Sequence, residues 1–155
     1  MDEGQPRPPQ RQTVLFKYIA SYTATAAVML VIDMVWLGLI ARQLYRSGIG
    51  HLMAESPNLV AAGVFYLLYP IGLMVFAVLP NTFPIALWVE ANSAWAHAGV
   101  AGALFGFIAY ATYDLSNLAT LKNWPLHLTL IDIAWGTFAS ALATLAGRWA
   151  LDRWS

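Results

Sequence analysis

The chain has 155 residues, of which 59% are hydrophobic and 10% are Asp, Glu, Lys or Arg. Soluble domains carry roughly 25% charged residues, so this composition, with a mean hydropathy of +0.59, is typical of a membrane protein. Its eight basic and eight acidic residues balance, which argues against a nucleic-acid partner. The lack of cysteine excludes disulfides and thiolate metal ligands.

The first 12 residues are polar and rich in proline, and we expect them to form a disordered tail. Four apolar stretches follow, each near the roughly 20 residues that a helix needs to cross a bilayer. We therefore expect residues 13–155 to form one all-α domain, an integral membrane bundle of about four transmembrane helices. The predicted spans are 18–41, 59–79, 94–119 and 126–149.

The connections contain helix boundary signals. Residues 45–58 should include a brief interfacial helix, and Ser56-Pro57-Asn58 is typical of a turn followed by a helix start. Pro70 should kink the second span. Residues 80–92 begin with PNTFP and should end that span in a loop or interfacial segment. Lys122-Asn123-Trp124-Pro125 predicts a tight turn before the fourth span.

The basic residues favour one orientation. If both termini are cytoplasmic, five basic residues lie inside and three lie outside. The positive-inside rule then predicts cytoplasmic termini and a multi-pass protein of the bacterial inner membrane. The inner set is Arg7, Arg11, Lys17, Arg148 and Arg153, and the outer set is Arg42, Arg46 and Lys122.

Three aspartates are the only ionisable residues well inside the predicted spans: Asp33, Asp114 and Asp132. At 1.5 Å per residue, Asp33 lies roughly 5 Å and Asp114 about 10 Å past the middle of their spans. Asp132 lies about 9 Å before the middle of a span that runs the other way. All three should therefore occupy the same half of the membrane, toward the Lys122 turn.

Small residues suggest that these acids point into the bundle. Asp114 and Asp132 each continue a row of small or polar residues at four-residue spacing, and such rows mark close helix–helix contacts. The rows are Gly102, Gly106, Tyr110 and Asp114 in the third span, and Asp132, Gly136, Ser140 and Thr144 in the fourth. Thr25, Met29 and Asp33 share a less distinct row in the first span.

An Asp-x-x-Trp pattern occurs twice, at Asp33–Trp36 and Asp132–Trp135. Helical side chains lean toward the N-terminus, so we expect each indole to reach back over the aspartate of its own helix and to donate to it. Tyr113 and Asn117 flank Asp114 and are candidate hydrogen-bonding residues. His127, five residues before Asp132, is a candidate proton relay.

No lysine or arginine lies in the span interiors to pair with the acids. Loss of water disfavours the charged form of a carboxyl, and neighbouring acids add to this effect. We expect at least one of the three to be protonated at neutral pH. Protonated aspartates can also serve only to tie helices together by hydrogen bonds, so a structural role remains open.

Several cofactor classes do not fit. Without a lysine inside a span there is no retinal Schiff base, and His51, His97 and His127 lie in separate regions and cannot hold one haem. We expect no cofactor and no metal.

The tryptophans near span ends should form an interfacial belt; they are Trp88, Trp95, Trp124, Trp149 and Trp154. Deeper aromatic residues should pack the core or line an apolar pocket; they are Trp36, Trp135, Tyr66, Tyr69 and Tyr110.

The segment YDLSNLATLKNWP, residues 113–125, followed by DIAWG, residues 132–136, resembles a bacterial membrane-protein family catalogued as domain of unknown function 2177. The earlier Asp33-Met34-Val35-Trp36 fits the same pattern. Ser116 stands where a typical member is expected to have Thr, which keeps the hydroxyl. The resemblance implies an integral membrane protein of about four spans and no settled activity.

The residues leave three functions open. The first is binding or movement of a small protonatable or lipid-like ligand at a polar site made by the three aspartates, Tyr113, Asn117, Trp36 and Trp135, with proton coupling through an aspartate. The second is a membrane enzyme acting on a lipid, isoprenoid or quinone with carboxyls as acid and base. The third is a non-catalytic subunit or assembly factor of a membrane complex. Membrane lipid is the expected partner, and a four-span carrier would act as a homo-oligomer.

Overall fold

The structure, a computed structural model, describes residues 11–79 and 94–154, and these two ranges contain helices and turns but no strand. The first half holds α1 (Arg11–Val35), the π-helix η1 (Trp36–Ile40), α2 (Arg42–Ile49), the 3-10 turn η2 (Gly50–Leu52), α3 (Leu59–Leu73) and the π-helix η3 (Met74–Val78). The second half holds α4 (Ala94–Thr120) and α5 (Leu126–Arg153).

Four helical segments are long and apolar enough to cross a membrane, which confirms the predicted all-α membrane bundle. They are Val14–Ile40, Leu59–Val78, Ala94–Thr120 and Leu126–Arg153. Residues 1–10 of the predicted tail lie outside the described residues, whereas Arg11 and Gln12 belong to α1. The predicted break at 80–92 and Trp88 also lie outside them. The predicted connection at 45–58 contains the end of α2 and the turn η2, and α2 begins earlier than expected, directly after the first span; its interfacial position stays a prediction.

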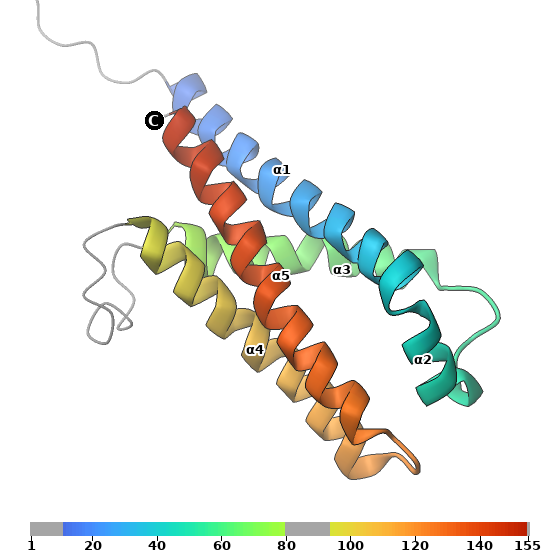
Figure 1. The fold of residues 1–155 in the computed structure, drawn as a ribbon. Coiled ribbons are helices and arrows are strands. Elements are labelled where there is room, and N and C mark those ends of the chain that lie inside the picture. Colours follow the sequence, from blue (N-terminus) through green and yellow to red (C-terminus); the bar gives the residue numbers. More distant parts are fainter. Residues whose placement is uncertain (1–10, 80–93, 155) are drawn as a thin grey trace, which may run out of the picture.

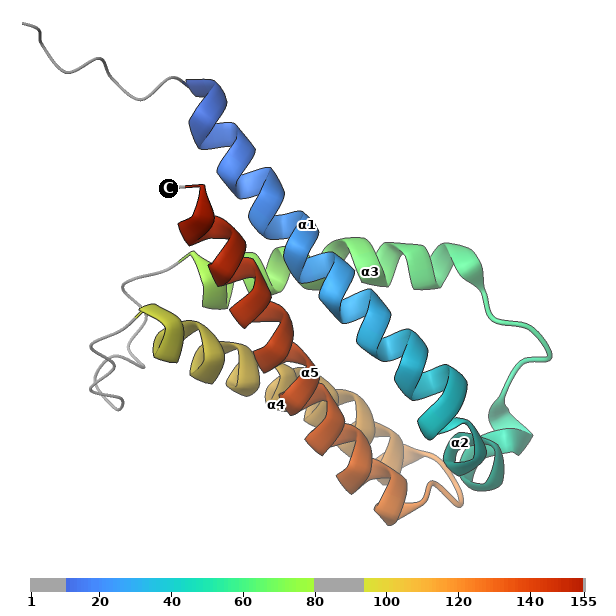
Figure 2. The ribbon, with the colours of Figure 1, turned by 45° about the horizontal axis from the view of Figure 1, so that its top comes forward.

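Helix α5 is central to the arrangement (Figure 1). It pairs antiparallel with α4 through the short turn between them, and α1 runs antiparallel along it on another side. Helix α3 lies across this layer in both ribbon views (Figure 2), contacting α1, while η3 contacts α4 and α5. The start of α1 and the end of α5 meet, with the Phe16 and Trp154 rings 5.0 Å apart between centroids.

Glycine lets α4 and α5 approach closely, which confirms the predicted small-residue rows. A methyl group at Gly102 would lie 2.8 Å from Thr144 Cγ2 and 2.9 Å from the Ser140 carbonyl oxygen. One at Gly106 would collide with the Gly136 carbonyl oxygen. Such contact between backbones is how membrane helices gain packing energy where no hydrophobic effect drives them together.

The row on the first span is also buried. Ser21, Thr25, Met29 and Asp33, spaced four residues apart, all face the interior. The Ser21 hydroxyl donates to the Gly147 carbonyl oxygen of α5 over 2.8 Å. This row therefore fixes the side of α1 that meets α5, and it points Asp33 inward.

Both predicted helix starts are confirmed. The Asn58 side chain caps α3 by accepting from the Val60 and Ala61 amides, each over 3.1 Å. Pro125 is the N-cap residue of α5, after a turn in which Asn123 has a φ of 60°. Pro70 lies inside α3, which changes to π geometry at Met74; the kink expected there stays a prediction.

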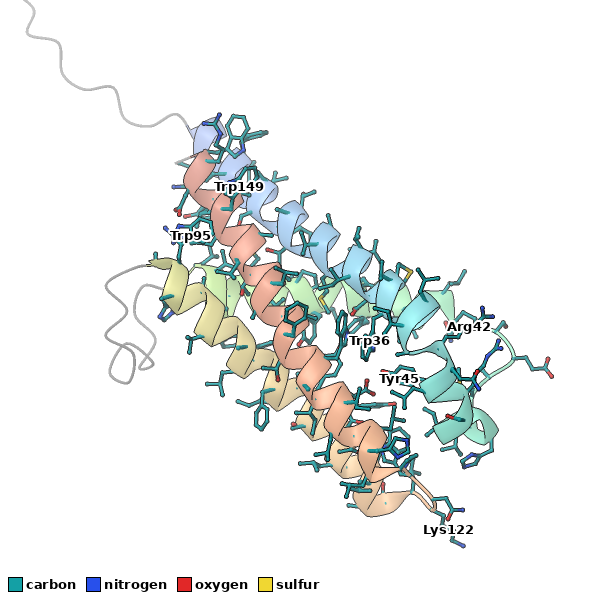
Figure 3. The ribbon with its side chains drawn as sticks, viewed as in Figure 1. Trp36, Arg42, Tyr45, Trp95, Lys122 and Trp149 are labelled. Atoms are coloured by element: carbon teal, nitrogen blue, oxygen red, sulfur yellow. The ribbon has the colours of Figure 1, made fainter. Side chains whose placement is uncertain are left out.

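Among the tryptophans of the predicted belt, Trp124 is buried and not exposed. Its indole nitrogen donates to Thr129 Oγ1 over 3.1 Å because the turn folds the side chain back onto the first turns of α5. Trp95, Trp149 and Trp154 are exposed, and their place in an interfacial belt stays a prediction. Two of them, Trp95 and Trp149, lie near the end of the molecule where α1 begins and α5 ends (Figure 3).

Candidate functional site

Three helices each place one aspartate in the interior, at the end of the molecule near the α4–α5 turn. Asp33 of α1 is 3% exposed, Asp114 of α4 is fully buried, and Asp132 of α5 is 3% exposed. Asp132 lies near enough to both of the others for the carboxyls to interact electrostatically. The predicted convergence of acids from separate helices is therefore confirmed.

Asp33 is held by two donors from other helices. Trp135 Nε1 of α5 donates to Asp33 Oδ1 over 3.0 Å, and the Tyr66 hydroxyl of α3 donates to Asp33 Oδ2 over 3.3 Å. Each oxygen of this carboxyl thus has a partner. These bonds tie α1 to α5 and to α3 at one point.

Asp132 is held by a residue from outside the spans. The Tyr45 hydroxyl of α2 donates to Asp132 Oδ1, and Trp36 Nε1 lies 3.5 Å from the Tyr45 oxygen. Figure 3 shows Trp36 and Tyr45 in the space between the α1–α2 segment and α5. Burial, together with the adjacent Asp132, raises the pKa of the Tyr45 phenol above its ordinary value. Tyr45 therefore remains a hydrogen-bond donor at physiological pH.

The expected shielding of each aspartate by the tryptophan of its own helix is wrong. Trp135 donates to Asp33 across the α1–α5 contact, and Trp36 donates to Tyr45. The two indoles stack on each other instead, with centroids 4.3 Å apart and planes inclined by 5°. The reason is that α1 and α5 run antiparallel, so the two Asp-x-x-Trp turns face each other and each tryptophan meets the opposite helix.

Asp114 differs from the other two acids. Both of its carboxyl oxygens are buried, and neither has a hydrogen-bond partner among the described residues. The Asp114 carboxyl interacts electrostatically with the carboxyl of Asp132, and the Tyr45 phenol also lies within electrostatic range. A buried carboxyl without a donor costs about 1–3 kcal/mol or more, so it calls for an explanation.

The remaining predicted site residues lie at the edge of this cluster. Tyr113 is 55% exposed and packs edge-on against Trp124, with centroids 5.9 Å apart. Asn117 is half-buried, one turn closer to the α4–α5 loop than Asp114, and His127 is exposed on the first turn of α5. The hydrogen-bonding role of Tyr113 and Asn117 and the relay role of His127 stay predictions.

Tyr45 was not among the predicted site residues, because residues 45–58 were expected to form only a connection. Tyr66 and Tyr69 were predicted as apolar lining, whereas the Tyr69 hydroxyl pairs with Ser140 Oγ over 2.9 Å. A signal was available: buried tyrosines normally hydrogen-bond, and acids in a chain without nearby cations need neutral donors.

No basic side chain in the described part of the chain forms an ion pair with these acids; the ion pair that it contains joins Arg148 to Asp152 on α5. Within residues 11–79 and 94–154, no group of three or more His, Cys, Asp or Glu side chains is placed to hold a metal ion. The site is thus acidic, with tryptophan and tyrosine as its donors.

A helical bundle with four candidate spans and three interior aspartates defines the class: a multi-pass integral membrane protein. Residues 18–149 match the model of a family described as "Predicted membrane protein (DUF2177)". The match covers most of the chain, so the chain belongs to this family, as the sequence motifs indicated. None of the curated proteins and none of the solved structures compared with it gives a match.

Proposed function

We propose that the protein binds or moves a small protonatable or lipid-like ligand at the buried acidic cluster. The observation that carries the proposal is Asp114, a fully buried carboxyl with both oxygens unpartnered within the described residues. Asp33 accepts indole and phenol hydrogen bonds on both oxygens and Asp132 accepts one phenol hydrogen bond, so Asp114 is the member left without any donor among the described residues.

The chemistry follows from the change in charge of one carboxyl. An ionisable residue inside a membrane protein is costly, and where it persists it commonly marks an ion or proton pathway. When Asp114 is neutral it stays beside Asp132 without repulsion, and when it is charged it attracts a proton or a cationic group. Uptake and release at Asp114 would couple ligand occupancy to proton movement.

The place of action in this proposal is the inner membrane of a bacterium, with both termini in the cytoplasm. The excess of basic residues on the terminal side supports that orientation. A carrier of only four spans would act as a homo-oligomer, because a single copy offers few helices to enclose a pathway.

Proteoliposomes loaded with a pH-sensitive dye test the proposal. After an acid pulse, vesicles with the native protein should acidify faster than empty ones, and Asp114→Asn should reduce that excess rate at least tenfold. Asp152→Asn is the matched control, because Asp152 is an exposed acid paired with Arg148 far from the cluster. An Asp114→Asn rate equal to that of the native protein would refute the proposal and favour a subunit whose acids only tie helices together.

A further inference from the structure

Four hydrogen-bond donors of the cluster are already in use, and the Tyr110 phenol, which lies within electrostatic range of Asp33 and Asp132, is not among the groups that act on Asp114. Trp135 and Tyr66 donate to Asp33, Tyr45 donates to Asp132, and Trp36 donates to Tyr45. Each of these donors has a single polar hydrogen. The cluster therefore holds no spare donor among these four side chains for Asp114.

Asp114 adds two acceptors to this setting. Both oxygens are enclosed and unpartnered among the described residues, and they lie near the Asp132 carboxyl. What this arrangement lacks is positive charge together with polar hydrogens. A group with both properties would satisfy Asp114 and relieve its repulsion with Asp132 at once.

We propose that Asp114 and Asp132 together bind an ammonium group of the ligand. This inference rests on the proposed function and narrows the ligand to a primary amine in its charged form. A primary ammonium carries three N–H donors, which match in number the two unpartnered Asp114 oxygens and the Asp132 oxygen that does not accept from Tyr45. Phosphate and carboxylate head groups carry the wrong charge and only acceptors, so the same site rejects them.

A bare metal cation fits this site less well than an ammonium group. Metal ions need a shell of several ligand atoms, and the described residues provide no cluster of three or more acidic or histidine side chains for one. The ammonium group instead needs directed acceptors, which two carboxyls supply. Its source can be a free amine or the amine of a lipid head group, and the chemistry at Asp114 is the same.

Thermal unfolding of the purified protein in detergent, at constant ionic strength, tests the proposal with methylammonium as the probe. Methylammonium should raise the melting temperature by roughly 5 °C when its concentration reaches about 100 times Kd. Tetramethylammonium has the same charge but no N–H, so it should give no shift, and sodium should give none. Asp114→Asn should abolish the methylammonium shift, and Asp152→Asn should retain it.

The comparison of methylammonium with tetramethylammonium uses the native protein, so it remains decisive if Asp114→Asn fails to fold. Equal shifts from the two ions, or from sodium, would overturn the proposal. So would a shift that persists in folded Asp114→Asn.

Measurements in lipid nanodiscs distinguish the amine of a lipid head group from a free amine as the source of the ammonium group. If phosphatidylethanolamine stabilises the protein more than phosphatidylcholine does, and only when Asp114 is present, the ammonium belongs to a lipid head group. No stabilisation by either methylammonium or phosphatidylethanolamine would overturn the inference. The proposed function would still stand if acid-driven proton flux depended on Asp114, so the two failures are distinguishable.

Discussion

Replacing Trp135 with phenylalanine removes the indole donor that reaches Asp33 from α5 and leaves an aromatic ring beside Trp36. The Trp135 Nε1 to Asp33 Oδ1 distance of 3.0 Å is that of a full hydrogen bond. Hydrogen bonds between membrane helices contribute about 0.6–2 kcal/mol. Asp33 keeps only its longer bond from Tyr66, at 3.3 Å. We expect Trp135→Phe to lower the free energy of unfolding by about 1–2 kcal/mol.

A double-mutant cycle isolates this bond from the loss of ring area. Asp33→Leu removes the acceptor, and the cycle with Trp135→Phe should show a coupling of about 1 kcal/mol. Reversible unfolding in mixed micelles titrated with sodium dodecyl sulfate gives the four free energies. The matched control is the cycle of Asp132→Leu with Trp135→Phe, which pairs residues of the same helix.

The control decides between two geometries. If Trp135 bonds across to α1, its coupling to Asp132 should stay below about 0.5 kcal/mol. Coupling to Asp132 that equals or exceeds coupling to Asp33 would refute the crossed arrangement. It would favour the arrangement in which each tryptophan donates a hydrogen bond to the aspartate of its own helix.

Three further outcomes follow from the packing, the phenol and the charge pattern. Gly106→Ala should destabilise the protein by about 1–3 kcal/mol in the same unfolding assay, because the added methyl group meets a backbone carbonyl of α5. Gly63→Ala is the control, since an added methyl group there meets no atom within 4 Å. Equal effects of the two substitutions would contradict the close approach of α4 and α5. Because the raised pKa of Tyr45 favours its neutral form in the folded protein, the stability advantage of the native chain over Tyr45→Phe should be present below about pH 10 and should fall as pH rises beyond it. An advantage that grows above that pH would show the opposite sign. In this cysteine-free chain, Lys122→Cys should react with an impermeant maleimide from outside whole cells and Arg153→Cys only after lysis, and the reverse pattern would invert the topology.

Much of the fold was predictable because the bilayer restricts the choices. A membrane span must form its backbone hydrogen bonds within itself, because lipid offers no partners. An apolar stretch of about 20 residues therefore predicts a helix without knowledge of its neighbours. The helix starts at Asn58 and Pro125 depend on local sequence. The four-residue spacing of Gly102 and Gly106 by itself predicts that another helix packs closely there. Helix counting also placed the three acids at one depth, since rise per residue is fixed by geometry.

The partners of those acids were not predictable in the same way. Helix counting gives the depth of a residue but leaves open which helix lies opposite. The spacing of Asp132 and Trp135 suggested a contact within one helix, and only the antiparallel packing of α1 on α5 turned Trp135 toward Asp33. Tyr45 was missed because its role depends on α2 folding back toward α5 after the first span ends.

From its residues alone, then, the chain determined its class, its spans and the burial of three aspartates without a cation in the span interiors. Those properties depend on composition and on helical periodicity, which are local. The tertiary structure decided which donor serves which acid, and it left Asp114 without one among the described residues. That outcome depends on the relative rotation of helices distant in sequence, and no local pattern encodes it.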